Sequence, residues 1–334
     1  MKISTIDLGY QPALLAPIDE VTDASFRFMC KRFGAAMMYT EFVSSDGLIR
    51  DADTTVAKLK IYEHERPIGI QIYGHLIDAM VEAARIAEEA KPDLIDINYG
   101  CPMKKIAIRG AGSGMLLDVP KMVEMTRQIV NAVKIPVTAK TRLGWDEDNK
   151  NIVEVAERLQ DVGIAALTIH GRTRSQVYKG YADWRLIGEV KRNPRMHIPI
   201  IGNGDIKQAQ DAKRVFDRYG VDGVMVARAT YGRPWIFREI NHYLQTGELL
   251  PEPDVRERVE IAKLHFSKSL EYKEGLRAIF EMRRHFTTYF KYLPDFKETR
   301  LKLVTSEDPQ EIFSLLDYIG ERWGGCSMSS SQLS

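Results

Sequence analysis

The sequence predicts an α/β fold, a (β/α)8 or TIM barrel followed by a smaller all-α helical domain. Short apolar and β-branched runs alternate with amphipathic helical stretches up to residue 229. Such alternation requires a parallel sheet. There are eight of these units, whereas a doubly wound sheet usually has about five to seven strands. After this region no further strand pattern occurs, and the chain becomes helical in character.

Each expected strand is a short run followed by a turn or helix pattern. Apolar residues at three- and four-residue spacing predict intervening helices, for example over 78–90, 119–133 and 151–163. The expected strands are ALLAPI (13–18), AAMMYTEFV (35–43), PIGIQIY (67–73), LIDINYG (94–100), PVTAKTR (136–142), ALTIHGR (166–172), PIIGNGD (199–205) and GVMVARA (223–229).

Polar residues recur at the carboxyl ends of these strands. In a (β/α)8 barrel the active site lies at that end. One such residue is ordinarily a surface side chain or a strand terminator, but seven at the same mouth favour a site. They are Gln71, Asn98, Lys140, Arg142, His170, Asn203 and Arg228.

The residue pattern of the chain changes after residue 248. Pro251 and Pro253 predict a linker, which divides a barrel domain over 1–248 from a helical domain over 249–323. The terminal GGCSMSSSQLS, 324–334, is expected to be a disordered tail. Within 276–293 a 3.6-residue period places Ile279, Met282, Phe286, Phe290 and Leu293 on one face and Arg277, Arg284 and Lys291 on the other.

Bulk composition is that of an ordinary globular protein, with 44% apolar and 28% charged residues. No run approaches the roughly 18 apolar residues of a membrane span, and MKISTIDLGY carries an acid where a signal peptide would be apolar. We therefore expect a cytoplasmic protein without membrane contact, and no obligate protein partner is indicated. The net charge of +1 does not support nucleic-acid binding, but 255–300 holds 11 Lys and Arg against seven Asp and Glu.

The three cysteines are Cys30, Cys101 and Cys326, with no C-x-x-C spacing. Neither a disulfide framework nor a metal site is indicated. Cys101 lies in INYGCPMKKI, between a strand end and two lysines. From position alone it could be a nucleophile, an acid, a metal ligand or an inert thiol.

Two glycine-containing loops favour a phosphate-bearing cofactor. Barrels of this kind often hold phosphate with the loops after strands 7 and 8, which here read GNGDI (202–206) and ARATYGRPWIF (227–237). Gly204 permits close backbone approach, Arg228 adds charge, and Pro234 suits the first turn of a helix. Carbonyl-rich flavin mononucleotide (FMN) fits the polar residues at the other strand ends. No G-x-G-x-x-G opens a βαβ unit; GAGSG (110–114) is only superficially similar.

With these residues in place, the chain resembles the tRNA-dihydrouridine synthases over nearly its whole length. The shared motifs are APIDEVTDASFR, INYGCPMKK, GAGSGMLL, KTRLGW, IHGRTR, GNGDI and GRPWIFREI. The similarity is greatest to the bacterial B-type enzymes, and GCP is its most specific part. It implies a barrel holding FMN, a helical domain that docks tRNA, and reduction of one uridine to 5,6-dihydrouridine with NADPH.

The resemblance also implies residue roles. The matching cysteine, Cys101, is the acid, and we add Asn98 as a residue that orients flavin or base. In three places the chain departs from the family pattern: Ile18 stands where Met is usual, Asp19 and Glu20 replace smaller residues, and Ala227 replaces a Gly. The positions matching flavin ligands are Ala16, Pro17, Ile18, Gln71, Lys140, His170, Asn203, Gly204, Asp205, Ala227 and Arg228.

The expected chemistry is a hydride to carbon 6 of uracil and a proton to carbon 5. A thiol with a pKa of about 8.5 is mostly protonated at neutral pH, so the neighbouring lysines are expected to point outward toward RNA. The uridine must leave the tRNA fold to reach the mouth. Candidate tRNA contacts are Lys104, Lys105, Arg109, Arg142, Arg174, Arg277, Arg284 and Lys291.

Two other functions remain open on the sequence. An FMN barrel acting on a free pyrimidine, such as a dihydroorotate dehydrogenase, would share Lys140 and the phosphate end but would not need the basic helical domain. An RNA-folding protein that has lost its chemistry would be colourless when purified. Taken alone, the charged face of 276–293 is that of a plain amphipathic helix exposed to water.

Overall fold

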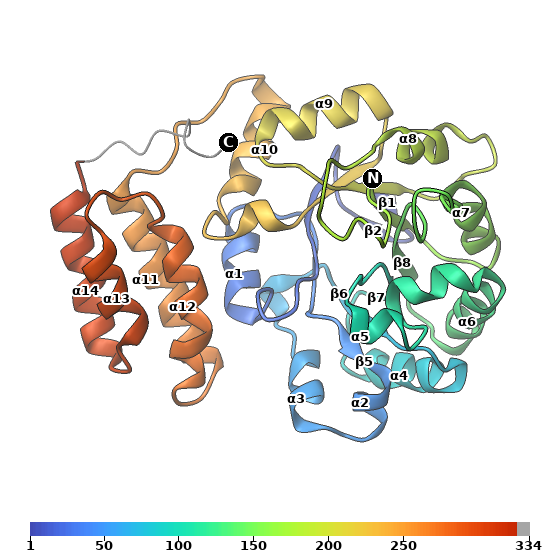
Figure 1. Ribbon diagram of the computed structural model, residues 1–334, viewed down its shortest axis with the longest axis horizontal. Coiled ribbons are helices and arrows are strands. Elements are labelled where there is room, and N and C mark those ends of the chain that lie inside the picture. Colours follow the sequence, from blue (N-terminus) through green and yellow to red (C-terminus); the bar gives the residue numbers. More distant parts are fainter. Residues whose placement is uncertain (326–334) are drawn as a thin grey trace.

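The computed structural model describes residues 1–325, and its larger part is a closed barrel of eight parallel strands (Figure 1). The ring closes where Leu14 bridges Met37 and the Leu15 N–H donates to the Met37 carbonyl at 3.0 Å. All eight expected strands are present and the fold class is confirmed. They are β3 (Ala13–Leu15), β4 (Met38–Tyr39), β6 (Ile68–Tyr73), β7 (Leu94–Tyr99), β8 (Val137–Arg142), β9 (Leu167–His170), β10 (Ile200–Asn203) and β11 (Gly223–Val226).

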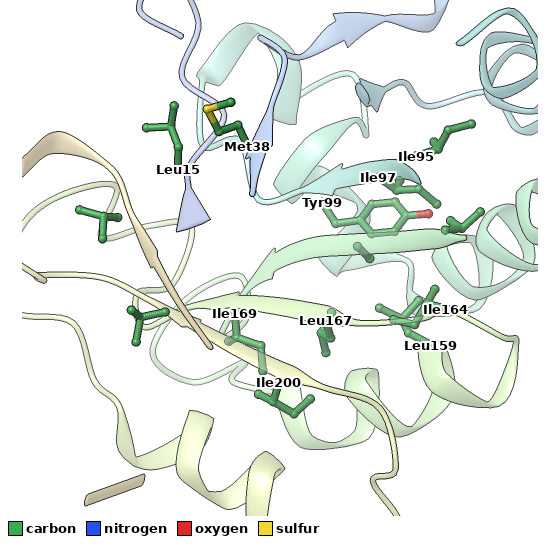
Figure 2. Packing of buried hydrophobic residues seen from close by; sticks show 14 of the residues in the cluster. Leu15, Met38, Ile95, Ile97, Tyr99, Leu159, Ile164, Leu167, Ile169 and Ile200 are labelled. Carbon is green, nitrogen blue, oxygen red and sulfur yellow. The ribbon is translucent and has the colours of Figure 1, made fainter. Parts of the chain in front are cut away.

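The barrel is covered by helices that contribute the outer half of its core. The three helices expected over 78–90, 119–133 and 151–163 are present as α4 (Ile77–Glu89), α6 (Val119–Ala132) and α7 (Ile152–Asp161). In Figure 2, Ile97 and Tyr99 of β7 lie among the buried residues of this layer, and the Tyr99 hydroxyl hydrogen-bonds to Thr126 at 2.8 Å. The main helices are α1 (Ala24–Arg32), α4 (Ile77–Glu89), α6 (Val119–Ala132), α7 (Ile152–Asp161), α8 (Arg185–Arg192), α9 (Ala209–Tyr219) and α10 (Ile236–Thr246).

Several short elements were not expected from the sequence. An antiparallel hairpin of β1 (Lys2–Ile3) and β2 (Ile6–Asp7) precedes the barrel, and Ile3 packs with Leu14 and Tyr39 in a separate buried cluster. The chain between β4 and β6 forms β5 (Val43–Ser44), α2 (Ser45–Ile49), α3 (Asp53–Val56), η1 (Ala57–Leu59) and η2 (Glu63–Glu65). Elsewhere lie α5 (Lys104–Ala107), η3 (Gly112–Leu117) and η4 (Arg228–Thr230).

Four helices form a bundle beside the barrel, on the side of α1 (Figure 1). They are α11 (Val255–Tyr272), α12 (Arg277–Tyr289), α13 (Lys297–Thr305) and α14 (Pro309–Trp323). The expected apolar face of 276–293 is fully buried in this bundle. Met29 and Trp235 of the barrel belong to the same hydrophobic cluster, so the two parts share a core.

The predicted linker and tail have different outcomes. Residues 247–254, which include Pro251 and Pro253, form no helix or strand between α10 and α11. The expected tail, 324–334, lies almost entirely outside the described residues. No helix within residues 1–325 combines the length and apolar character needed to cross a bilayer.

Candidate active site

A cavity of about 1660 Å³ opens at the carboxyl ends of the barrel strands. The pairing register explains why the polar ends meet there: Asn98 lies opposite Lys140, and His170 lies opposite both Arg142 and Asn203. The structure thus brings the catalytic and flavin-binding candidates into one space. Lining residues include Ala16, Pro17, Ile18, Gln71, Asn98, Cys101, Lys140, Arg142, His170, Asn203, Gly204, Asp205, Ala227 and Arg228.

A buried carboxylate fixes the amide side chains of β6 and β7. Asp96 accepts hydrogen bonds from Gln71 Nε2 and Thr138 Oγ1, each at 2.6 Å, and burial raises its pKa to about 6. Asn98 Nδ2 donates to Gln71 Oε1 at 2.8 Å. The amides therefore have fixed orientations. Asp96 was not among the sequence candidates, although a carboxylate within the apolar run LIDINY was the available sign.

The loop that carries Cys101 is held by hydrogen bonds at both ends. Asn98 Oδ1 accepts from the N–H groups of Gly100 and Cys101, both at 2.9 Å. The Cys101 carbonyl accepts from the Ser113 hydroxyl at 2.7 Å. Gly112 has φ +55°, and a Cβ there would lie 3.1 Å from the Cys101 Cβ. GAGSG thus supports the cysteine loop.

Cys101 is nearly buried, with 7% of the residue exposed. Burial raises the pKa of the thiol, while the Met103 N–H and the Arg142 guanidinium act to lower it. The thiol is therefore protonated at neutral pH. Lys104, Lys105 and Arg109 are exposed and do not line the cavity, in agreement with the expected outward orientation.

Lys140 and His170 place basic groups in the cavity, and the pKa of each is lowered. Lys140 Nζ donates to Asn203 Oδ1 at 3.3 Å. Burial and the charge of Arg142 lower the pKa of Lys140 to about 8. Burial, followed by the charges of Arg142 and Lys140, lowers the pKa of His170 well below its usual value, so its imidazole is neutral at pH 7.

The loop after β10 is shaped by Gly204 and Asp205. Gly204 has φ +129°, and a Cβ there would lie 2.7 Å from the Ala182 Cβ and 3.1 Å from the His170 ring. Asp205 accepts from Arg172 Nη2 at 2.8 Å and from Arg228 Nη2 at 3.4 Å. Arg172 is buried and was not singled out in the sequence, although it lies within IHGRTR.

Arg142, a candidate for tRNA binding, is buried and engaged with the backbone. Its Nε donates to the Gly100 carbonyl at 2.7 Å, and its Nη1 donates to the carbonyls of Thr173 and Val177, each at 2.9 Å. It therefore connects the cysteine loop to the loop after β9. Arg174, also a tRNA candidate, is half-buried with its guanidinium 4.5 Å from the Trp145 ring centroid.

The three cations of the helical face occupy different surroundings. Arg277 Nε pairs with Glu281 at 2.7 Å and does not line the cavity. Arg284 Nη2 contacts the Glu20 carboxylate at 2.8 Å. Lys291 lies just beyond α12, is exposed, and lines the cavity. The structure therefore places Arg284 and Lys291 near the mouth.

The donor set fits a flat, carbonyl-bearing ring with an attached phosphate. Gln71, Asn98, Lys140, Gly204 and Arg228 all line the same cavity, and the amides of Gln71 and Asn98 are buried in its wall. Among residues 1–325, no group of three or more His, Cys, Asp or Glu side chains is arranged to hold a metal ion.

Comparison with known proteins decides the family. Residues 14–320 match the family model for dihydrouridine synthase (Dus). The chain belongs to this family of oxidoreductases. It is 40% identical over 298 residues to tRNA-dihydrouridine synthase B of Pseudomonas putida, covering 89% of this chain and 88% of that protein. It is 39% identical over 313 residues to tRNA-dihydrouridine synthase B of Pseudomonas aeruginosa, covering 92% and 93%.

Two further likenesses extend this comparison. Probable tRNA-dihydrouridine synthase 1 of Synechocystis is 40% identical over 318 residues, covering 95% of this chain and 88% of that protein. Among solved structures, an old yellow enzyme homologue from Zymomonas mobilis has a TM-score of 0.48 and 14% identity, covering 72% of this chain and 89% of that one. The second likeness is too weak to bear on function.

Proposed function

We propose that this Dus family member reduces a uridine of tRNA to 5,6-dihydrouridine, with bound FMN, with NADPH as the electron donor and with Cys101 as the proton donor. The observation that carries the proposal is a protonated, preorganised thiol in the same cavity as Gln71, Asn98 and Lys140. The names of the relatives support tRNA as the substrate.

The flavin-binding residues divide into two groups. Gln71 and Lys140 would bind the ring carbonyls and nitrogens, with His170 beside them. The phosphate would lie at the backbone of Gly204 and near the Arg228 guanidinium. When bound and reduced by NADPH, FMN would supply a hydride to carbon 6 of the uracil. Ala16, Pro17, Ile18, Asn203, Asp205 and Ala227 would complete the lining of this site.

Cys101 would hold a proton on Sγ and deliver it to carbon 5 of the uracil. Burial keeps the thiol neutral, and the two hydrogen bonds to Asn98 Oδ1 fix the backbone on which it sits. Arg142 acts as a positioning residue, because it holds the carbonyl of Gly100 immediately before the cysteine. A general acid in a fixed position needs this kind of support.

The RNA would be held by cations around the mouth while the target base is extruded into the cavity. Lys104, Lys105 and Arg109 are exposed beside the cysteine loop. Arg174 lies on the loop after β9, and Lys291 lies just beyond α12 and lines the cavity. Arg277 lies at the N-terminal end of α12 and would contact the body of the tRNA.

Replacing the thiol tests the proposal. Cys101→Ala should retain flavin colour and NADPH oxidation in air, but should lose dihydrouridine formation in unmodified tRNA by about 100-fold or more. The control is Cys326→Ser, which removes another thiol and should leave both activities unchanged. Dihydrouridine formation at the wild-type rate by Cys101→Ala would refute the assigned proton donor, and a purified protein without flavin would refute the cofactor.

A further inference from the structure

Glu20 places a negative charge at the lip of the cavity through which an RNA would enter. It lies on the loop after β3 and lines the cavity together with Asp19. An acid in this position is unfavourable for binding a polyanion. Any role of Glu20 toward RNA rests on the proposed tRNA substrate.

Glu20 accepts hydrogen bonds from the guanidinium of Arg284, which is 264 residues away in the sequence. Arg284 Nη2 donates to the Glu20 carboxylate at 2.8 Å, and Nη1 donates to the Glu20 carbonyl at 2.9 Å. Both Nη groups of Arg284 thus donate to Glu20, and arginine uses the same groups to bind a phosphate. A phosphate cannot use these two N–H donors while Glu20 holds them, and the Glu20 carboxylate offsets the charge of the guanidinium.

The loop around Glu20 is held in a specific conformation. Glu20 has φ +58°, a region that residues other than glycine rarely occupy. Its N–H donates to Glu41 Oε1 at 2.6 Å. Lys58 pairs with Asp19 at 2.6 Å and with Glu41 at 3.5 Å. Lys58 therefore pairs with Asp19 and Glu41 but not with Glu20, whose carboxylate pairs with Arg284.

The ion pair lies beside the entrance. Thr288, one helical turn after Arg284 on α12, lines the cavity, and so does Lys291. A phosphate bound by Arg284 would therefore lie on the side of the cavity that Lys291 lines. This places the pair where RNA must pass to deliver a base to Cys101.

Holding the bundle against the barrel does not require this pair. The side chain of Glu20 is 73% exposed and that of Arg284 47% exposed, and exposed pairs contribute little to stability. By contrast, Lys273 of the bundle meets Asp23 of the barrel at 3.0 Å with both side chains 9% exposed. A shared hydrophobic cluster joins the two parts as well.

We propose that Glu20 competes with an RNA phosphate for Arg284, and so lowers the affinity of the free enzyme for RNA. The displacement costs the same for every RNA. Only an RNA that also contacts the other cations around the mouth can then bind at low concentration. Glu20 would thus lower the affinity for every RNA that uses Arg284, and so raise the number of contacts an RNA must make to bind at a given concentration.

Single substitutions with opposite expected signs test the competition. Glu20→Gln keeps the shape and removes the charge, and it should lower the tRNA KM and the tRNA Kd by up to about fivefold. Arg284→Gln should raise both. If the pair were only a latch between bundle and barrel, the two variants would change KM in the same direction, and that result would overturn the proposal.

A double variant separates competition from general repulsion. In the Arg284→Gln background, Glu20→Gln should lower the tRNA Kd by less than it does in the wild type, because the contested cation is gone and only direct repulsion of the RNA is relieved. An equal drop in Kd in both backgrounds would mean that Glu20 repels RNA directly, which contradicts the proposal. Equilibrium binding of unmodified tRNA needs no turnover, so a protein that binds tRNA without forming dihydrouridine would refute the proposed function and leave this test intact.

Discussion

At the scale of single residues, the protonation states in the cavity follow from burial more than from neighbouring charges. Cys101 lies near Arg142 and Lys140, which act to lower its pKa, yet burial is the larger effect and raises it. Lys104 and Lys105 are next to it in sequence but exposed. The thiol therefore keeps its proton at neutral pH, as the proposed acid requires.

The pKa of Lys140 predicts that dihydrouridine formation depends on pH. Its pKa is lowered to about 8, so its positive charge is present below that pH and is lost as the pH rises through it. Dihydrouridine formation should therefore decline above about pH 8, and Lys140→Gln should be slow at all pH values without this decline. The measurement is kcat/KM for tRNA from pH 6 to 10.

The matched control for Lys140 is Lys134→Gln, which removes an exposed lysine preceding the same strand. It should keep both the rate and the decline of the wild type. A wild-type profile that stays level beyond pH 9 would show that the charge of Lys140 is not used. A decline of equal midpoint in Lys140→Gln would assign the titration to another group.

At the scale of elements, the segment formed by the cysteine loop and α5 has one side in the cavity and one side at the surface. Asn98, Ser113 and Arg142 hold the backbone on the cavity side. The cations of α5 and of Arg109 face water. This division lets the same short segment carry a neutral acid and a phosphate-binding surface.

Replacing Lys104, Lys105 and Arg109 together by Gln should weaken tRNA binding and leave NADPH oxidation unchanged. Each phosphate contact that is lost means that about one counterion fewer is released on binding. The slope of the logarithm of the tRNA binding constant against the logarithm of the salt concentration should therefore become less steep by about two to three. The control replaces Lys134, Lys191 and Arg192, which lie away from the cavity lining. Equal slopes for the wild type and the first variant would remove these residues from the RNA interface.

At the scale of the whole molecule, the bundle and barrel are joined through buried polar groups as well as apolar ones. His265 of α11 contacts the Ser25 hydroxyl of α1 at 3.2 Å and the Tyr289 hydroxyl at 3.1 Å. His285 of α12 stacks on Phe26 with ring centroids 4.8 Å apart. Both imidazoles are buried at the junction, so protonation there affects how the two parts hold together.

This junction predicts acid sensitivity. Burial lowers the pKa of His285 to about 4, whereas an unfolded histidine titrates near 6.5. The unfolded state therefore binds more protons between these values, and the free energy of unfolding should fall as the pH drops from about 6.5 to 4. The loss is on the order of 3 kcal/mol at most for this residue. Asp23, Lys273, Arg284, Glu281 and His265 face it.

Urea unfolding at pH 7 and pH 5 measures the effect. His285→Gln should reduce the difference in unfolding free energy between the two pH values. The exposed His197→Gln is the control and should retain the full difference. An unchanged difference in His285→Gln would place the acid sensitivity elsewhere in the molecule.

Much of the fold followed from local pattern. The eight strands and the helices at 78–90, 119–133 and 151–163 were found because side-chain periodicity is written into neighbouring residues. The β1–β2 hairpin and the short elements between β4 and β6 were missed. Their strands are two residues long, too short for any period to appear.

The sequence by itself determined which strand ends carry polar residues, because the residues around each end show where the apolar run stops. In a (β/α)8 barrel all eight carboxyl ends meet at one mouth. The sequence could not determine the partners of those residues. The contacts from Asp96 to Gln71, from Arg142 to the loop after β9, and from Glu20 to Arg284 join residues 25 or more positions apart. Only the folded chain brings such groups within hydrogen-bonding distance, and burial then sets their charge.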